Sequence, residues 1–383
     1  MFQPPRYPVK ATNLEVWLHA RSPDDFPPFD SARGEKPHSE RYLDIKRVLA
    51  PYQLAAEKGA LLASAVKWKE EQLGKIRSDY ASDASQMERR IQELEDSSPF
   101  VYLNAHGEGH VDKVIQRASE LLQSNPECAL TAYEGYLLLC AIQFHDIGNF
   151  FGREGHEQKC SQIMEHECRQ IVRDRIERNT IVRIAMVHGG AYDGNRDTIA
   201  LLRPAQDLMG QRDVQKRFLA ALLRFADELA DDYSRADTAA LNTGILPTES
   251  VKHHRYSESL HTVAVSEQDI SLSFAYGSDI AMAPLYEGGP YLLDEIYRRT
   301  LKMERERRYC MRFLRPLVSI ERIRVEIEVE DSRHPLQKHR TSYALEETGY
   351  PIQPSPQSIH AFGSDLLEGQ KQAEYLREKW GLT

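Results

Sequence analysis

The middle of the chain carries histidines and aspartates of the kinds that bind divalent metal ions. His145 and Asp146 are adjacent and end an apolar, helix-like run, "LLLCAIQF". An aspartate in that place would be costly to bury unless a cation balanced its charge. Other histidines stand at or near the ends of other helix-like stretches, and one further aspartate lies inside another such stretch. The full set is His110, His145, Asp146, His156, His188 and Asp227.

These residue types indicate hydrolytic chemistry. Imidazole and carboxylate together suit Mn²⁺, Fe²⁺, Co²⁺, Ni²⁺ or Zn²⁺. A divalent ion lowers the pKa of its water, which gives hydroxide near neutral pH, and it polarises a phosphoryl oxygen as a Lewis acid. Two ions about 3.5–4 Å apart can share one carboxylate, and Asp146 is the natural bridging group. We therefore expect one or two divalent ions, with Mg²⁺ as a further candidate.

Helices whose ends converge are needed to bring these side chains together. Apolar residues recur at helical spacing over residues 109–123, 131–146, 155–174, 179–190 and 213–232. Glycines or other turn residues separate these stretches, as expected for a compact bundle. The sequence therefore predicts a helical core that carries the metal-binding set.

The pattern changes after residue 240. Residues 260–276 predict two strands with a turn at 267–269, and residues 319–331 alternate apolar and charged side chains like a third strand. Residues 290–314 predict a long helix between them. The predicted fold class is mainly α, with a helical bundle core and a small C-terminal α+β region of about three strands.

Three segments follow from these patterns. Residues 1–97 combine a Pro-rich start with a charged helical arm, residues 98–240 form the metal-binding helical core, and residues 241–383 form an α+β extension and tail. The arm has polar side chains on most faces over residues 67–96. It is either an exposed arm or a surface for self-association, and in the second case we expect a homo-oligomer.

Composition narrows the class of protein. The formal net charge of −9 and the pI near 5.9 argue against binding of duplex nucleic acid, whose binders usually carry a basic footprint. Five cysteines without C-x-x-C spacing are typical of reduced thiols in a cytosolic protein. The N-terminus has no signal-peptide pattern, and no apolar run approaches the ~20 residues that span a bilayer. We expect a cytoplasmic protein without a membrane partner.

The order and local context of the motifs resemble the HD-domain metal-dependent phosphohydrolases. "GHVDKV" surrounds His110, "HDIG" contains the adjacent His145 and Asp146, and "RFADELAD" surrounds Asp227. The stretches "NAHGEGH" and "REGHEQKC" are most similar to the HD-CE subgroup, which occurs in bacterial conflict and defence systems. The resemblance covers residues 100–236 and implies an enzyme with an HD-type helical core, with a role in antiviral defence.

The resemblance also implies roles for individual residues. The family's metal ligands correspond to His110, His145, Asp146 and Asp227. In two-metal members further histidines hold the second ion, and His156 and His188 match them in order. Asp146, His156 and His188 are the expected catalytic residues. Candidates for substrate binding, chosen for charge or polarity near the ligands, are Lys113, Arg153, Tyr192, Arg196, Arg224 and Asp231.

The substrate stays open between three alternatives. Triphosphohydrolase members usually read H-D-x-G-H-x-P-F-G-H, but this chain has Asn149 at the first extra histidine. The cyclic dinucleotide branch has a G-Y-P triplet that "HGGAYDGNR" lacks. We favour a (deoxy)nucleoside triphosphate triphosphohydrolase that uses metal-bound hydroxide, on its similar outline. The alternatives are a cyclic (oligo)nucleotide phosphodiesterase and a nucleotide-sensing regulatory protein without turnover, switched by a nucleotide effector and acting through a partner protein.

Overall fold

The structure is a computed structural model. The residues it describes are 4–10, 12–27, 34–53, 74, 77–78, 85–89, 108–148, 156–189, 191, 194–204, 206–208, 211–244, 246, 248–346 and 359–381. Most of the predicted arm lies outside this set, so the surface for self-association expected there stays a prediction. Among the described residues, every helix is too short or too polar to cross a bilayer.

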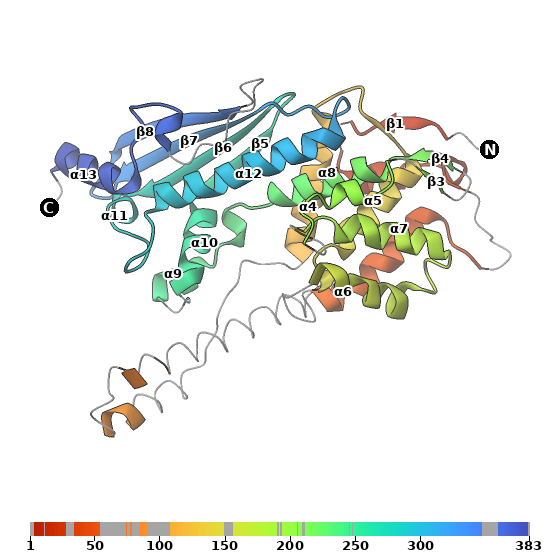
Figure 1. Cartoon of the computed structure of the whole chain (residues 1–383), viewed down its shortest axis with the longest axis horizontal. Coiled ribbons are helices and arrows are strands. Elements are labelled where there is room, and N and C mark those ends of the chain that lie inside the picture. The colour runs from red at the N-terminus through yellow and green to blue at the C-terminus, as the bar shows by residue number, and fades with distance from the viewer. Residues whose placement is uncertain are drawn as a thin grey trace.

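A bundle of helices forms the first half of the described chain (Figure 1). It contains α1 (Leu14–His19), a helix over residues 38–53, α4 (Glu108–Gln123), α5 (Ala132–Phe144), α6 (His156–Ile163), a π-helical turn (Met164–Cys168), α7 (Arg175–Met186) and α8 (Lys216–Glu228). Two short antiparallel pairs lie beside them, β1 (Arg6–Pro8) with β2 (Ala129–Thr131) and β3 (Gln206–Leu208) with β4 (Gln211–Val214).

Helix α5 is the centre of this bundle, and all thirteen of its residues are buried. A capping box fixes its start, because the Thr131 hydroxyl accepts from the Glu134 N–H at 3.1 Å and the Glu134 carboxylate accepts from the Thr131 N–H at 3.0 Å. Helices α4, α7 and α8 pack around α5. Since His145 directly follows Phe144, this packing sets where the adjacent His145 and Asp146 lie.

The C-terminal half is an α+β region (Figure 1). Its sheet has the order β5 (Leu260–Val265), β6 (Asp269–Gly277), β7 (Arg322–Asp331), β8 (His334–Glu346), in which β6 and β7 are parallel and the outer pairs are antiparallel. The helices there are α9 (Thr238–Thr243), α10 (Thr248–Ser259), α11 (Ser278–Ala281), α12 (Leu292–Leu314) and α13 (Gly369–Trp380). Helix α12 makes the crossover from β6 to β7 and runs along the sheet to α8.

The predicted fold class is confirmed, with one difference in the sheet. The three expected strands are β5, β6 and β7, and the structure adds the edge strand β8. Buried side chains of the bundle and of the α+β region form one continuous hydrophobic core that includes Leu14, Leu138 and Ile327. The domain boundaries predicted at residues 97 and 240 stay predictions.

Candidate metal centre

Two histidines from different helices meet at the buried end of α5. His110 is the third residue of α4 and is 4% exposed, and His145 follows the last residue of α5 and is 0% exposed. Their Nε2 atoms are 3.4 Å apart. The Nδ1 atom of His145 lies 2.6 Å from the Ile142 carbonyl oxygen, which can only accept, so Nδ1 carries the proton. The Nε2 atom of His145 therefore faces His110.

Two carboxylates approach the same pair of nitrogens. The Asp227 Oδ1 atom, near the end of α8, lies 3.1 Å from His110 Nε2 and 3.6 Å from His145 Nε2. The Asp146 Oδ2 atom lies 3.7 Å and 3.6 Å from the same two nitrogens. Three segments far apart in the sequence thus deliver two imidazoles and two carboxylates to one point.

His188 approaches Asp146 from another side. It lies two residues after α7, and its Nε2 atom is 3.5 Å from Asp146 Oδ1. Its Nδ1 atom donates to the Ala185 carbonyl oxygen at 2.5 Å. His145 makes the same kind of hydrogen bond, to the carbonyl oxygen three residues earlier in the chain. The rings of His145 and His188 are nearly perpendicular, with centroids 5.1 Å apart. Asp146 thus directs Oδ2 toward the nitrogens of His110 and His145, and Oδ1 toward the nitrogen of His188.

The electrostatics of this cluster call for a cation. Burial, and then the positive charge of Arg235, lower the pKa of His110 to about 4. Burial also opposes a charge on His145, but the Asp146 and Asp227 carboxylates outweigh it and raise the pKa of His145 to about 9. The two histidines hold the pKa of Asp227 well below its usual range, although burial opposes this. A proton on His145 offsets one of the two carboxylate charges, and a divalent ion would offset both.

The donor set fits a transition-metal ion. His110, His145 and Asp146 each offer one ligand atom, and these atoms all lie within 4.8 Å of one another. Mixed imidazole and carboxylate donors suit Mn²⁺, Fe²⁺, Co²⁺, Ni²⁺ or Zn²⁺. Hydrogen bonds from Nδ1 to backbone carbonyls, of the kind made by His145 and His188, orient metal-binding imidazoles in many proteins.

Four of the predicted substrate-binding residues lie in the described part of the chain. Lys113 pairs with Asp232 at 2.7 Å, and Arg196 is exposed. Arg224 forms a bidentate pair with Glu306, with contacts of 2.7 and 2.9 Å. The Lys113 and Arg224 side chains are thus already engaged within the protein. Contact of these residues with a substrate stays a prediction.

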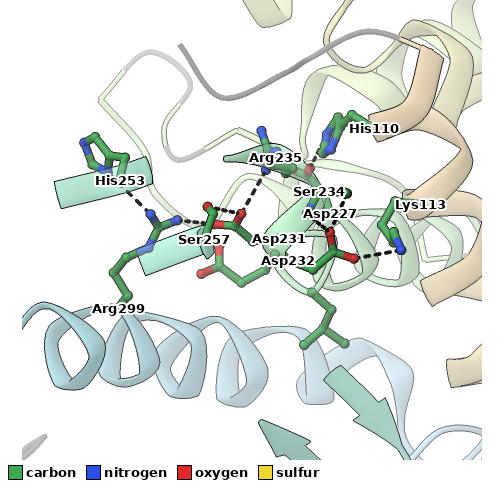
Figure 2. A network of polar contacts seen from close by, with 12 residues as sticks. His110, Lys113, Asp227, Asp231, Asp232, Ser234, Arg235, His253, Ser257 and Arg299 are labelled. Carbon is green, nitrogen blue, oxygen red and sulfur yellow. Dashed lines mark hydrogen bonds and ion pairs between the residues drawn. The ribbon is translucent and has the colours of Figure 1, made fainter. Parts of the chain in front are cut away.

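Asp231, the fourth of these residues, lies inside a polar network behind Asp227 (Figure 2). Its carboxylate accepts from Arg299 at 2.7 Å and from the Ser257 hydroxyl at 2.7 Å. Arg299, from α12, also donates to His253 of α10 at 3.4 Å. The sequence interpretation missed this network. One available signal was the four-residue spacing of His253 and Ser257, which places both on one face of a helix.

Three other predicted site residues are not placed. Arg153 and Tyr192 lie outside the described residues. His156 is the first residue of α6, but its side chain is outside the described part. Their expected roles stay predictions.

Comparison with known proteins identifies the family. A family model described as HD-CE matches residues 91–300, which contain all the histidines and aspartates of the cluster. The comparison with curated proteins found no match. The family match and the His–Asp cluster indicate an HD-type metal-dependent hydrolase. Because the matched region spans more than half of the 383 residues, the chain belongs to the HD-CE family.

Proposed function

We propose that this protein is a metal-dependent phosphohydrolase that acts on nucleotides. The observation that carries the proposal is the convergence of His110 Nε2 and His145 Nε2 with the carboxylates of Asp146 and Asp227, at 3.1 to 3.7 Å. The two carboxylates bring negative charges close together, and a cation among these atoms offsets their repulsion. A buried cluster of this kind is therefore built for binding a cation.

Each side chain of the cluster would have its own role in the reaction. His110, His145, Asp146 and Asp227 would hold a divalent ion, which supplies Lewis acidity toward a phosphoryl oxygen and lowers the pKa of a water. The hydrogen bond from His145 Nδ1 to the Ile142 carbonyl keeps the ring from turning away. Burial of His110 and His145 excludes bulk water, which strengthens their electrostatic interactions.

The directions of the two Asp146 oxygens support a second metal position beside the first. Oδ2 faces the His110 and His145 nitrogens, and Oδ1 faces His188 Nε2 at 3.5 Å. A carboxylate that directs its oxygens to two groups of nitrogens is suited to bridge two ions. His188, with His156 as the predicted further ligand, would complete the second position.

For the substrate we favour a (deoxy)nucleoside triphosphate, cleaved to nucleoside and triphosphate. The support is the outline of the chain, an HD-type helical domain followed by a small α+β region. Positive charge beside the cluster adds to it, because burial and then the charge of Arg235, which pairs with Asp231 at 3.9 Å, lower the pKa of His110. A polyphosphate tail would be attracted by the same charge.

Metal analysis followed by a nucleotide panel tests the proposal. The purified chain, stripped with EDTA and reloaded with Mn²⁺ or Co²⁺, would be given deoxynucleoside and ribonucleoside triphosphates and cyclic nucleotides, with product identification. We expect triphosphate release that Asp146→Ala abolishes. Asp112→Asn, a change of an exposed α4 aspartate (55% exposed), is the control and should leave the rate unchanged.

Other outcomes would indicate a different function for the same site, or would refute the proposal. Linear products from a cyclic substrate would make the protein a phosphodiesterase. Tight nucleotide binding without turnover in any metal would make it a sensor. A chain that binds no divalent ion, or an Asp146→Ala variant that binds metal as well as the parent, would overturn the metal-dependent reaction itself.

A further inference from the structure

Hydrogen bonds connect the turn that carries His188 to α12, the long helix that lies along the sheet of the α+β region (Figure 1). The ties are hydrogen bonds to the backbone on both sides of His188. The Thr198 hydroxyl donates to the Val187 carbonyl oxygen at 3.0 Å. Arg224 Nη1 donates to the Gly189 carbonyl oxygen at 3.0 Å and to Thr198 Oγ1 at 3.0 Å. The carbonyl groups of Val187 and Gly189, on either side of His188, are thus both held by one connected set of side chains.

That set ends on Glu306 of α12. Arg224 Nε and Nη2 lie 2.7 and 2.9 Å from the two Glu306 oxygens, a bidentate arrangement. Bidentate pairs between arginine and a carboxylate fix the plane of the guanidinium group, as well as adding energy. The guanidinium group also lies over the Tyr309 ring, 4.6 Å from its centroid. The pair with Glu306 therefore fixes the direction of Nη1, the guanidinium nitrogen of Arg224 that does not contact Glu306.

The far end of the same loop is tied to α12 as well. The Tyr309 hydroxyl donates to Asp197 at 3.0 Å and accepts from the Ile199 N–H at 2.9 Å. Arg312 pairs with Asp197 at 3.1 Å. Helix α12 therefore holds segment 197–199 directly. It holds segment 187–189 through Arg224, which pairs with Glu306.

We propose that Glu306, acting through Arg224, is a positioning residue that holds His188 against Asp146. This deepens the proposed metal-dependent function and rests on it. Glu306, Tyr309 and Arg312 lie beyond residue 300, where the family match ends. Arg224, expected from the sequence to bind substrate, would act on the site through the backbone of the His188 turn.

A second ion pair between the same two helices provides the matched control. Lys302 of α12 pairs with Glu228 of α8 at 2.6 Å, and its side chain is 60% exposed. The pair of Lys302 and Glu228 links α8 to α12, as the pair of Arg224 and Glu306 does. It lies at the surface, however, and within the described part of the chain neither of its residues bonds the His188 turn. A change there tests the loss of an interhelical ion pair alone, which is worth roughly 0–1 kcal/mol for an exposed pair.

The test is a Co²⁺ titration of the full, metal-stripped chain, followed by visible absorption. Glu306→Gln should weaken Co²⁺ binding roughly 10-fold, the low end of the effect of removing partners that orient metal ligands. It should also change the Co²⁺ absorption bands in the direction seen for His188→Ala. Glu306→Asp, which keeps the carboxylate, should recover part of the affinity, and Lys302→Gln should match the parent in both readouts.

The outcomes separate this inference from the proposed function. If Asp146→Ala removes Co²⁺ binding while Glu306→Gln and Lys302→Gln both behave like the parent, the positioning role is refuted and the metal site stands. If Asp146→Ala binds Co²⁺ like the parent, the proposed function fails, and the positioning role fails with it. Thermal melts in EDTA check folding, and if Glu306→Gln is unfolded the decision falls to Arg224→Lys, which removes the bidentate pair. Parent-like bands and affinity in a folded Arg224→Lys variant would overturn the role.

Discussion

Metal removal offers the most direct thermodynamic test of the cluster. His110 and His145 hold two nitrogens 3.4 Å apart beside two carboxylates, and both rings are buried. An ion that binds there binds only the folded chain, because the ligands come from segments separated by up to 117 positions, from His110 to Asp227. Stripping the protein with EDTA should therefore lower its stability, and added Mn²⁺ should restore it.

The size of the effect follows from mass action. A ligand specific for the folded state stabilises it by about 2.7 kcal/mol at a free concentration of 100 times Kd, and by about 1.4 kcal/mol more for each further tenfold. Domains of 150–250 residues shift in Tm by roughly 2–4 °C per kcal/mol, and larger chains shift less. For this 383-residue chain we expect an increase of roughly 5 °C at 100 times Kd.

The assay is a thermal melt over a series of Mn²⁺ concentrations, repeated with Asp227→Asn. This change keeps the shape of the side chain and removes its charge, so the rise of Tm with Mn²⁺ should be largely lost. The exposed α4 change Asp112→Asn should keep the full rise. Equal midpoints in EDTA and in excess Mn²⁺ for the parent chain would refute the reasoning, as would an undiminished rise in Asp227→Asn.

Three further predictions concern stability. Arg41→Met should cost about 3–5 kcal/mol in urea unfolding, because it leaves the buried Glu177 carboxylate, now 3.2 Å from Arg41, without its cation; a loss below 1 kcal/mol would contradict this. Gly135→Ala should cost about 1–3 kcal/mol by the same assay, since its Cβ would meet the buried Trp17 ring, and a neutral change would contradict the packing. The two arginines of β7 lower the pKa of Asp269 by hydrogen bonds, so its stabilisation is present above the unfolded pKa of about 3.9 and is lost as pH falls through the lower folded pKa. Asp269→Asn should be less stable than the parent at pH 7 and approach it in acid, and a gap that widens in acid would reverse the sign.

The sequence was most informative where local patterns decide the structure. Helical spacing predicted α4, α5, α7 and α8, and the position of a histidine just after a helix is itself a local property. His145 and His188 both donate to a carbonyl three residues earlier, and this needs only the end of their own helix. The candidate metal group of His110, His145 and Asp146 could therefore be anticipated before any tertiary contact was known.

Features decided by tertiary contacts could not be predicted in the same way. Strand β8 reads "HPLQKHRTSYALE", with a proline and many charges, because it is an edge strand with mostly exposed or half-buried side chains. Arg224 has the residue type of a phosphate ligand, and only the approach of α12 pairs it with Glu306. Asp231 shares a helix face with Asp227 in the sequence, but Arg299 and Ser257 reach it from other elements.

The complete burial of α5 has a consequence for motion. Amide groups in a helix covered on every side exchange their hydrogens with solvent only when the whole domain opens. We expect α5 to show the slowest hydrogen exchange in the chain, and it ends at the adjacent His145 and Asp146. The protein would then hold this part of the site in its slowest-moving element. Any breathing that admits a substrate would have to come from the elements around α5, such as the turn that carries His188.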